Sequence, residues 1–177
     1  MKHISLAKLA AVAAGILFFA HNLAANPDNF TVPSATGGGK FTLAEAKGKF
    51  VAVHFLLKTE CPVCLRHTRE YATKAATLPN VVQVFLKPDS AGDIKAWAGK
   101  LPADLVAKYP IYRDADAALA KAFKVPDGYK FHGEVVHYPA LVLLDPDGKE
   151  VFRHVGKSNS DRFSFEKLAA KVEELRK

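Results

Sequence analysis

The sequence is poor in cysteine: its 177 residues include two, Cys61 and Cys64. Two cysteines are too few for a disulfide-stapled scaffold, and a pair three residues apart cannot join distant parts of the chain. A structural zinc site needs four ligands, and the chain has no second cysteine pair to complete one. The cysteines are therefore expected to serve a local, chemical purpose.

The sequence also lacks an apolar run long enough for an ordinary transmembrane helix. Such a helix needs about 20 apolar residues, whereas the run Leu9–Ala20 has twelve apolar or small residues and His21 follows it. Lys2 precedes the run and Ala25 comes shortly after it, which is the layout of a secretory signal peptide spanning residues 1–25 and cleaved near Ala25. No cysteine stands at its end, so a lipid anchor is disfavoured. We expect a periplasmic or secreted protein with no stable membrane insertion after cleavage.

Concentrated charge, internal repeats and low-complexity segments are missing as well. The net charge is +7, but the basic residues are spread along the chain, so nothing indicates nucleic-acid binding. With 49% hydrophobic and 24% charged residues, the composition is that of one globular domain. We expect an extended lead-in over residues 26–40, a single domain over residues 41–177, and a monomer.

Apolar and β-branched runs alternate with segments of helical patterning. Strands are predicted at 30–32, 50–57, 81–86, 110–113, 135–137, 140–144 and 150–155. Helices are predicted at 65–76, at 90–105 with an interruption by Pro102, at 115–123 and at 163–175. The alternation predicts a three-layer α/β domain, in which helices flank a mixed central sheet that is parallel at first and ends in an antiparallel hairpin.

The two cysteines form a Cys-x-x-Cys motif between a buried strand and a helix. Cys61, at or near the helix N-cap, would face unpaired backbone N–H groups and the positive end of the helix dipole, which favour a thiolate. Pro62 suits the first helical position because its missing N–H costs nothing there. Cys61 is thus predicted to be the nucleophile and Cys64, one turn on, the resolving cysteine.

Four segments carry a resemblance to a known family. They are Phe41-Thr42-Leu43, Gly48–Phe55, Thr59–Cys64 and Tyr138–Lys149. Together they resemble thioredoxin-fold proteins of the redoxin group, which contains the peroxiredoxin-like and the TlpA/ResA-like periplasmic proteins. The resemblance extends from about Phe41 to Leu175.

The resemblance implies a thioredoxin-like fold and a substrate-binding role for Pro62, Tyr138 and Pro139. Pro139 would be a cis-proline that faces the cysteine pair and presents backbone to a substrate. Tyr138 and Pro62 would contact the substrate beside it. No cofactor is implied.

Three activities occur on this fold. Copper-delivering Sco-type proteins have a histidine eight residues before an Asp-Pro-x-Gly turn, as His137 stands here, so Cys61, Cys64 and His137 are an alternative copper-ligand set. Peroxiredoxins carry Pro-x-x-x-Thr-x-x-Cys, but Leu57 and Cys61 replace the proline and the threonine, which makes a thiol peroxidase a lesser alternative.

The Cys-x-x-Cys oxidoreductases need no feature that this chain lacks. The sequence therefore predicts an exported thiol–disulfide oxidoreductase with Cys61 and Cys64 as catalytic residues, no resident metal or cofactor, protein disulfide or dithiol substrates, and a redox partner that recycles the pair. A redox-inactive binding domain is disfavoured because both cysteines are retained. Other candidates have mainly structural interpretations. His54 is expected in the buried strand, as a core residue or a base near the site, and Trp97 in the core, with substrate binding as the alternative. His67 and His132 are expected at the surface, and Arg153 and Arg162 in solvated positions, with positive charge for a substrate as the alternative.

Overall fold

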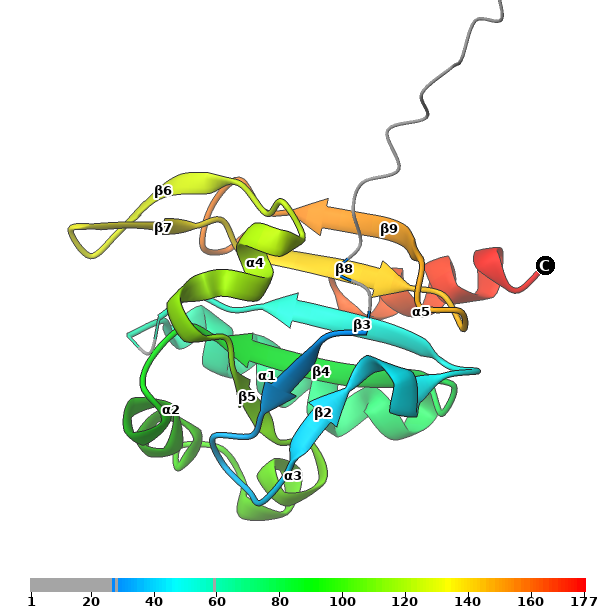
Figure 1. The fold of residues 1–177 in the computed structure, drawn as a ribbon, viewed down its shortest axis with the longest axis horizontal. Coiled ribbons are helices and arrows are strands. Elements are labelled where there is room, and N and C mark those ends of the chain that lie inside the picture. The colour runs from blue at the N-terminus through cyan, green and yellow to red at the C-terminus, as the bar shows by residue number, and fades with distance from the viewer. Residues whose placement is uncertain (1–26, 28, 59) are drawn as a thin grey trace, which may run out of the picture.

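A five-stranded sheet forms the centre of the computed structural model, which describes residues 27, 29–58 and 60–177. The predicted signal peptide lies outside the described residues. The strand order is β5-β4-β3-β8-β9 (Figure 1). The strands are β3 (Phe50–Phe55), β4 (Val81–Lys87), β5 (Ile111–Arg113), β8 (Ala140–Leu144) and β9 (Glu150–Val155).

The central strand β3 is buried along its whole length, and its residues are apolar on both faces apart from His54. It pairs in parallel with β4, which pairs in parallel with β5. On its other side it pairs antiparallel with β8, so that Val53 lies opposite Val142, and β8 and β9 form an antiparallel hairpin. The prediction of a mixed sheet that begins parallel and ends antiparallel is confirmed.

Helices and a small hairpin cover the two faces of the sheet. The helices are α1 (Pro62–Lys74), α2 (Ala91–Ala98), α3 (Ala103–Lys108), α4 (Ala118–Ala122) and α5 (Phe165–Leu175). On one face Tyr71 of α1, Trp97 of α2 and Leu168 of α5 join one apolar cluster with Ala52 of the central strand. Trp97 is thus a core residue, as predicted.

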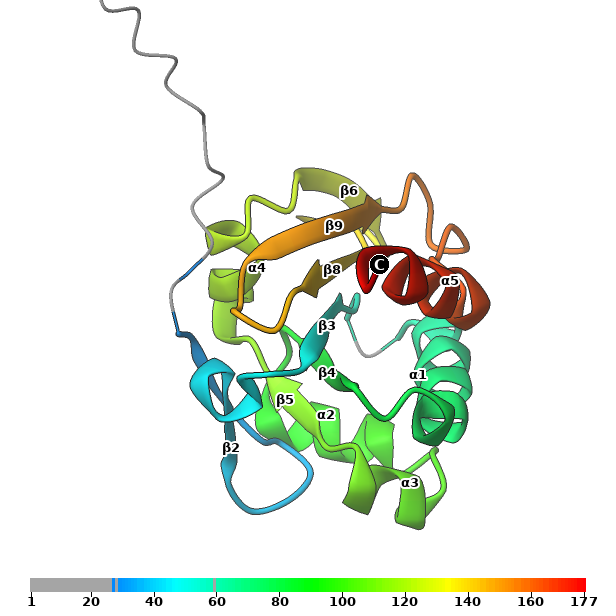
Figure 2. The same cartoon turned by 90° about the vertical axis from the view of Figure 1, so that its right-hand side faces the viewer.

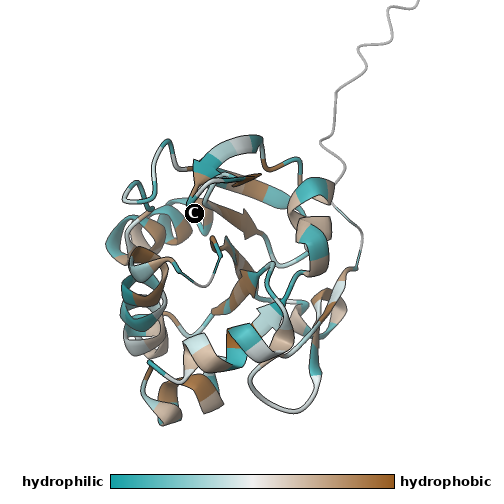
Figure 3. Cartoon of the chain, turned by 90° about the vertical axis from the view of Figure 1, so that its left-hand side faces the viewer, coloured by the Kyte–Doolittle hydropathy of each residue, from teal (hydrophilic) through white to brown (hydrophobic). Residues whose placement is uncertain are grey.

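The opposite face of the sheet is covered by α4 and by β1 (Thr31–Pro33) and β2 (Lys40–Thr42). There Phe41 and Phe123 join a second cluster with Val53, whose side chain points away from that of Ala52 because neighbouring residues of a strand alternate. Figure 2 shows α1 and α5 on one side of the strands and α4 on the other, and in Figure 3 hydrophobic residues concentrate on the central strands. The three-layer architecture is confirmed.

The segment between α3 and β8 differs most from the sequence prediction. Only Ala118–Ala122 of the predicted helix 115–123 is α-helical, because Asp116 and Ala117 adopt positive φ angles of 55° and 52°. Beyond it the chain forms a strand that the sequence does not predict, β6 (Asp127–Phe131), which pairs with β7 (Glu134–His137). This hairpin projects beyond the sheet at the end where β3 stops (Figure 1).

The predicted helix 90–105 is two helices, α2 and α3. Pro102, which stands at the N-cap of α3, separates them, since proline cannot continue a helix from the preceding turn. None of the helices in the described part of the chain is long and apolar enough to cross a membrane.

Candidate active site at the Cys61–Cys64 disulfide

Cys61 occupies the N-cap of α1, as the sequence predicts. Its backbone is extended (φ −80°, ψ 103°), Pro62 is the first helical residue, and Cys61 Sγ accepts a hydrogen bond of 3.0 Å from the backbone N–H of Cys64. The two cysteines form a disulfide whose Cα atoms are 5.3 Å apart. The backbone that holds the sulfur of Cys61 thus already supplies the donor that a thiolate would need.

Both sulfurs are buried. Cys61 is 1% exposed and Cys64 is not exposed at all. They belong to the apolar cluster that also contains Leu57, at the end of the central strand, and Phe131 of the β6–β7 hairpin. Pro62, by contrast, is exposed beside the buried pair.

Two residues that sequence reasoning missed lie against the sulfurs. Arg162 Nη2 is 3.4 Å from Cys64 Sγ and 3.8 Å from Cys61 Sγ. Asn159 Oδ1 is 3.1 Å from Cys61 Sγ and accepts a hydrogen bond of 3.0 Å from Arg162 Nη2. The sequence prediction of a solvated Arg162 is wrong, because the loop after β9 folds back and directs this side chain inward.

Arg162 is a half-buried positive charge beside the disulfide. Its Nε donates to the backbone oxygen of Asn159 at 2.9 Å, which fixes the plane of the guanidinium group. Burial lowers the pKa of Arg162 to about 10, so the group stays charged at neutral pH. A half-buried cation in contact with two sulfurs favours the thiolate over the thiol in the reduced pair.

Pro139 and Tyr138 lie in the bend that leads into β8. The prediction of a cis-proline is wrong: none of the described residues has a cis peptide bond, so Tyr138–Pro139 is trans. The trans form is the more stable one for a prolyl bond by about 0.5–1 kcal/mol, and nothing in this bend opposes it. Pro139 is buried and its oxygen accepts a hydrogen bond of 2.8 Å from the N–H of Gly156, while the N–H of Tyr138 donates to Pro126.

A chain of buried polar side chains runs between the central strands and α1. His54 Nε2 lies 2.9 Å from Gln83 Oε1, and His54 Nδ1 lies 3.0 Å from His67 Nε2. If His54 donates to the amide oxygen, its other nitrogen accepts from His67, so both rings are satisfied in their neutral forms. Burial lowers the pKa of His54 to about 4 and also lowers that of His67, with the charge of Arg162 adding to both effects.

His67 was predicted at the surface, and this prediction is wrong: the residue is 7% exposed. It follows Cys64 by three residues on α1, so it faces the same interior side of the helix. The ring of Tyr71, 4.5 Å away between centroids, covers it from the next turn. His54 is buried in the central strand, as predicted.

Lys87 is a further buried charge at this end of the sheet. Its Nζ donates to the backbone oxygen of Leu57, lies 4.4 Å from the centroid of the Trp97 ring, and is 4.0 Å from Asp89 Oδ2. Burial lowers the pKa of Lys87 to about 7. The lysine therefore ties the chain that leaves β3 towards Cys61 to the helix α2.

The residues predicted for a copper site do not come together. His137 is buried, its Nδ1 lies 2.7 Å from the backbone oxygen of Tyr138, and its ring packs edge-on against Phe55. In the part of the chain that the structure describes, no three His, Cys, Asp or Glu side chains are grouped so that they could hold a metal ion. The donor set Cys61, Cys64 and His137 thus does not fit a metal in this disulfide form.

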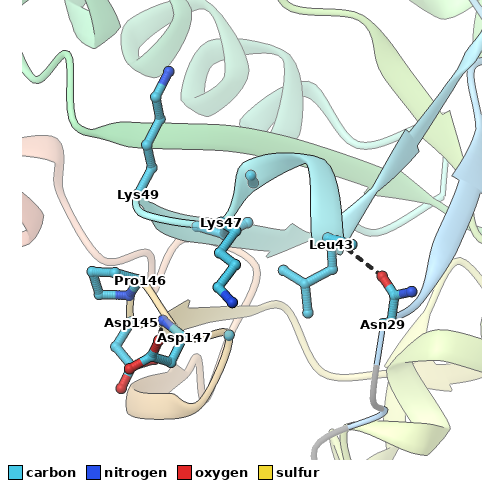
Figure 4. A pocket seen from close by; sticks show the side chains of 11 residues that line it. Asn29, Leu43, Lys47, Lys49, Asp145, Pro146 and Asp147 are labelled. Atoms are coloured by element: carbon cyan, nitrogen blue, oxygen red, sulfur yellow. Dashed lines mark hydrogen bonds between the residues drawn. The ribbon is translucent and has the colours of Figure 1, made fainter.

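A surface pocket of about 250 Å³ lies elsewhere (Figure 4). Lys47, Lys49 and the Asp145–Gly148 turn line it, and Asn29 Oδ1 accepts a hydrogen bond from the N–H of Ala44 at its edge. Since β3 begins here and ends next to Cys61, the pocket is at the opposite end of the sheet from the disulfide. It therefore plays no part in chemistry at the sulfurs.

Comparisons with solved structures agree with this fold. A secreted Mycobacterium tuberculosis disulfide oxidoreductase homologous to E. coli DsbE is 22% identical over 82% of this chain and 96% of its own, with a TM-score of 0.60. Xanthomonas campestris peroxiredoxin Q is 21% identical over 87% and 96%, with a TM-score of 0.68. The exposed lipoprotein thioredoxin Etrx1 of Streptococcus pneumoniae is 20% identical over 82% and 98%, with a TM-score of 0.64.

Sequence comparison gives the family. A search of curated proteins found no match. The model of the AhpC/TSA family matches residues 24–151, which include both cysteines and all strands of the central sheet up to the start of β9. The predicted membership of the thioredoxin-fold redoxin group is confirmed, and the chain belongs to the AhpC/TSA family.

Proposed function

We propose that the protein is an exported thiol–disulfide oxidoreductase that exchanges electrons with partner disulfides or dithiols through Cys61 and Cys64. One observation carries the proposal: the two cysteines are within bonding distance at a helix N-terminus, with the Arg162 guanidinium against both sulfurs. A passive disulfide needs no cation beside it. A pair that alternates between disulfide and dithiol gains from one, because only the reduced state carries negative charge.

The reaction proceeds through a mixed disulfide. In the reduced protein, Cys61 thiolate attacks one sulfur of a partner disulfide, so that a bond forms between Cys61 and the partner, and the partner's other sulfur leaves as a thiolate. Cys64, deprotonated beside Arg162, then attacks Cys61 Sγ and releases the partner as a dithiol. Two electrons pass from the cysteine pair to the partner, and the pair ends as the disulfide seen in this structure.

Each residue has a part in these steps. The N–H of Cys64 and the dipole of α1 stabilise negative charge on Cys61. Arg162 Nη2, which is closer to Cys64 Sγ than to Cys61 Sγ, stabilises the resolving sulfur most directly. The same contact lowers the energy of the Cys64 thiolate that leaves when the reaction runs in the reverse direction. Pro62, Tyr138 and Pro139, whose roles the family resemblance suggests, would contact the partner around the pair.

Two measurements test the proposal. Equilibration in dithiothreitol or glutathione buffers shows whether the Cys61–Cys64 pair can be reduced, and an insulin assay measures whether the reduced protein reduces a partner disulfide. The Cys61→Ser variant should lose the reductase activity, whereas Cys64→Ser should accumulate mixed disulfides that an alkylating reagent traps. A Cys61→Ser protein with wild-type reductase activity would overturn the proposal, and so would a pair that no redox buffer can reduce.

A thiol peroxidase is a second candidate, because the chain belongs to the AhpC/TSA family and Arg162 approaches Cys64, the cysteine that aligns with the peroxidatic position. Against it, Leu57 and Cys61 stand where the peroxiredoxin motif has proline and threonine. Peroxide consumption with dithiothreitol as reductant separates the two activities. Turnover that survives Cys61→Ser and is lost in Cys64→Ser would favour the peroxidase.

Export is part of the proposal through the signal-peptide pattern of residues 1–25. The neighbours of known location, the secreted mycobacterial oxidoreductase and the exposed pneumococcal lipoprotein, support it. Fractionation of cells that express the full chain, with mass spectrometry of the mature N-terminus, tests it: a protein that keeps Met1 and stays in the cytoplasm would contradict it.

Copper binding by Cys61, Cys64 and His137 has no geometric support here, and titration of the reduced protein with copper(I) tests it directly.

A further inference from the structure

Cys61 cannot be reached in this structure. Disulfide exchange requires the attacking sulfur to contact the sulfur that it attacks, yet Cys61 is 1% exposed. Asn159 Oδ1, at 3.1 Å, is already in contact with Cys61 Sγ. Some of the atoms that cover Cys61 must therefore move before any partner reacts.

The segment Gly156–Arg162 provides the part of this cover that lies against the sulfurs. It is a compact loop held by bonds within itself: the N–H of Lys157 donates to Asp161 Oδ2 at 2.8 Å, and the N–H of Asp161 donates to Ser158 at 3.2 Å. Arg162 Nε donates to Asn159 at 2.9 Å. Because the loop is tied to itself, its backbone holds the Asn159 side chain in place over Cys61.

Few bonds hold this loop to the rest of the molecule. The N–H of Gly156 donates to Pro139, and His154 Nε2 lies 3.2 Å from Asp161 Oδ1. Gly156 permits the close approach: a Cβ there would lie 2.2 Å from the Asp161 oxygen and 3.1 Å from the Pro139 ring. Arg162 and Asn159 contact the sulfurs, and directly after the loop the backbone oxygen of Phe163 accepts a hydrogen bond of 2.8 Å from Tyr71 Oη.

We propose that the segment Gly156–Arg162 is a gate over Cys61, and that Asn159 is the residue that decides how large a partner can reach the sulfur. In the closed position the Asn159 amide covers Cys61 and is latched by Arg162 Nη2. A small dithiol needs a small displacement of the amide. A dithiol on the surface of a folded protein needs the amide to leave Cys61 altogether, which breaks its hydrogen bond with Arg162 Nη2. This inference rests on the proposed redox function and adds a size selection to it.

The test follows the reduction of the Cys61–Cys64 disulfide by two probes, dithiothreitol and a folded dithiol protein, reduced thioredoxin. In both, a thiolate of the probe attacks Cys61 Sγ and Cys64 leaves as a thiolate. The second thiol of the probe then attacks the mixed disulfide, releasing reduced Cys61 and the oxidised probe. Two electrons and the matching protons move from the probe to the cysteine pair, so both reactions balance in the same way.

Asn159→Ala removes the amide and its bond with Arg162. We expect its second-order rate constant with thioredoxin to rise about tenfold, since a hydrogen bond to a charged group contributes about 1.5 kcal/mol and tenfold corresponds to 1.4 kcal/mol. The rate with dithiothreitol should change less than threefold. Asn159→Gln, which keeps the amide and adds bulk, should not accelerate the thioredoxin reaction. Ser158→Ala, at an exposed position of the same loop, is the matched control and should behave like the wild type.

The outcomes separate the gate from the function on which it rests. A wild-type disulfide that neither probe reduces refutes the proposed function. A redox-active wild type whose Asn159→Ala variant is unchanged with both probes refutes the gate. An equal acceleration with both probes also refutes it, because the amide would then act on the reactivity of the sulfur and not on access. If Asn159→Gln accelerates thioredoxin as much as Asn159→Ala does, covering by the amide is likewise refuted.

Discussion

Removing the positive charge of Arg162 should make the cysteine pair more strongly reducing. The guanidinium touches both sulfurs and its charge is retained at neutral pH, since burial lowers its pKa only to about 10. The disulfide is neutral, whereas the reduced pair carries a thiolate next to this cation. Arg162 therefore stabilises the reduced state, and Arg162→Gln should destabilise it relative to the disulfide.

The magnitude follows from the contacts. A hydrogen bond to a charged group contributes about 1.5–3 kcal/mol. For a two-electron couple about 30 mV corresponds to 1.4 kcal/mol, so the potential of Arg162→Gln should be about 30–60 mV more negative than that of the wild type. The ultraviolet absorbance of the thiolate should appear at higher pH in the variant, because the thiolate has lost its cation.

Redox titration in dithiothreitol buffers, with quantification of free thiols, measures this shift. Arg162→Lys keeps a charge near the sulfurs and should recover part of the potential. Arg153→Gln removes an arginine that is paired with Glu150 on β9 and serves as the matched control. The reasoning is refuted if Arg162→Gln has the wild-type potential and the wild-type thiolate titration, or if Arg153→Gln shifts both equally.

Three further predictions follow from buried groups. The pKa of His54 is lowered from 6.5 to about 4, so this side chain is neutral in the folded protein at neutral pH. The unfolded chain takes up a proton on His54 below pH 6.5, so the free energy of unfolding should fall by about 2–3 kcal/mol as the pH drops from 6.5 towards 4. Urea unfolding of His54→Asn should show a smaller fall, and an equal fall would contradict the assignment. The fluorescence of Trp97, the one tryptophan of the sequence, should titrate with a midpoint near pH 7 as Lys87 loses its charge, and a titration that persists in Lys87→Met would refute this. Gly156→Ala should cost about 1–3 kcal/mol of unfolding free energy in urea, because its Cβ meets the backbone of Asp161, whereas Gly38→Ala, which meets nothing within 4 Å, should cost much less.

The sheet and the cysteine motif could be predicted from the sequence because local patterns determine them. The run 50–57 is apolar on both faces apart from His54, which marks a central strand, and Cys61-Pro62 has the chemistry of a helix N-cap. The predicted strand 135–137 is present as β7. Its partner β6 was missed since Asp127 and Gly128 are typical turn residues, and only the pairing with β7 makes this segment a strand. Tertiary pairing overrode the local propensity there.

Arg162 and Asn159 could not be identified in the same way. Arg162 is 101 residues from Cys61 in the chain, and its segment has the composition of an ordinary polar loop. No local pattern signals that an arginine will turn inward; the decision depends on the compact loop that follows β9 and on Gly156, which lets the loop approach Pro139. His67 was misplaced for a related reason, since its polarity predicts the surface but a second histidine on β3 satisfies it in the interior.

The burial of the two sulfurs has opposite effects on their chemistry and on their access to partners. In the apolar interior the charge of Arg162 acts on the sulfurs more strongly than it would in water, so one cation can shift the equilibrium between disulfide and dithiol. The same burial prevents a partner from touching Cys61. A site with these properties can react only if the group that covers Cys61 moves. Asn159, which covers the sulfur, and Arg162, which supplies the charge, belong to one short loop. Movement of this loop would therefore couple access to electrostatics, since a partner that displaces Asn159 also loosens the contact of Arg162 with the sulfurs that it stabilises.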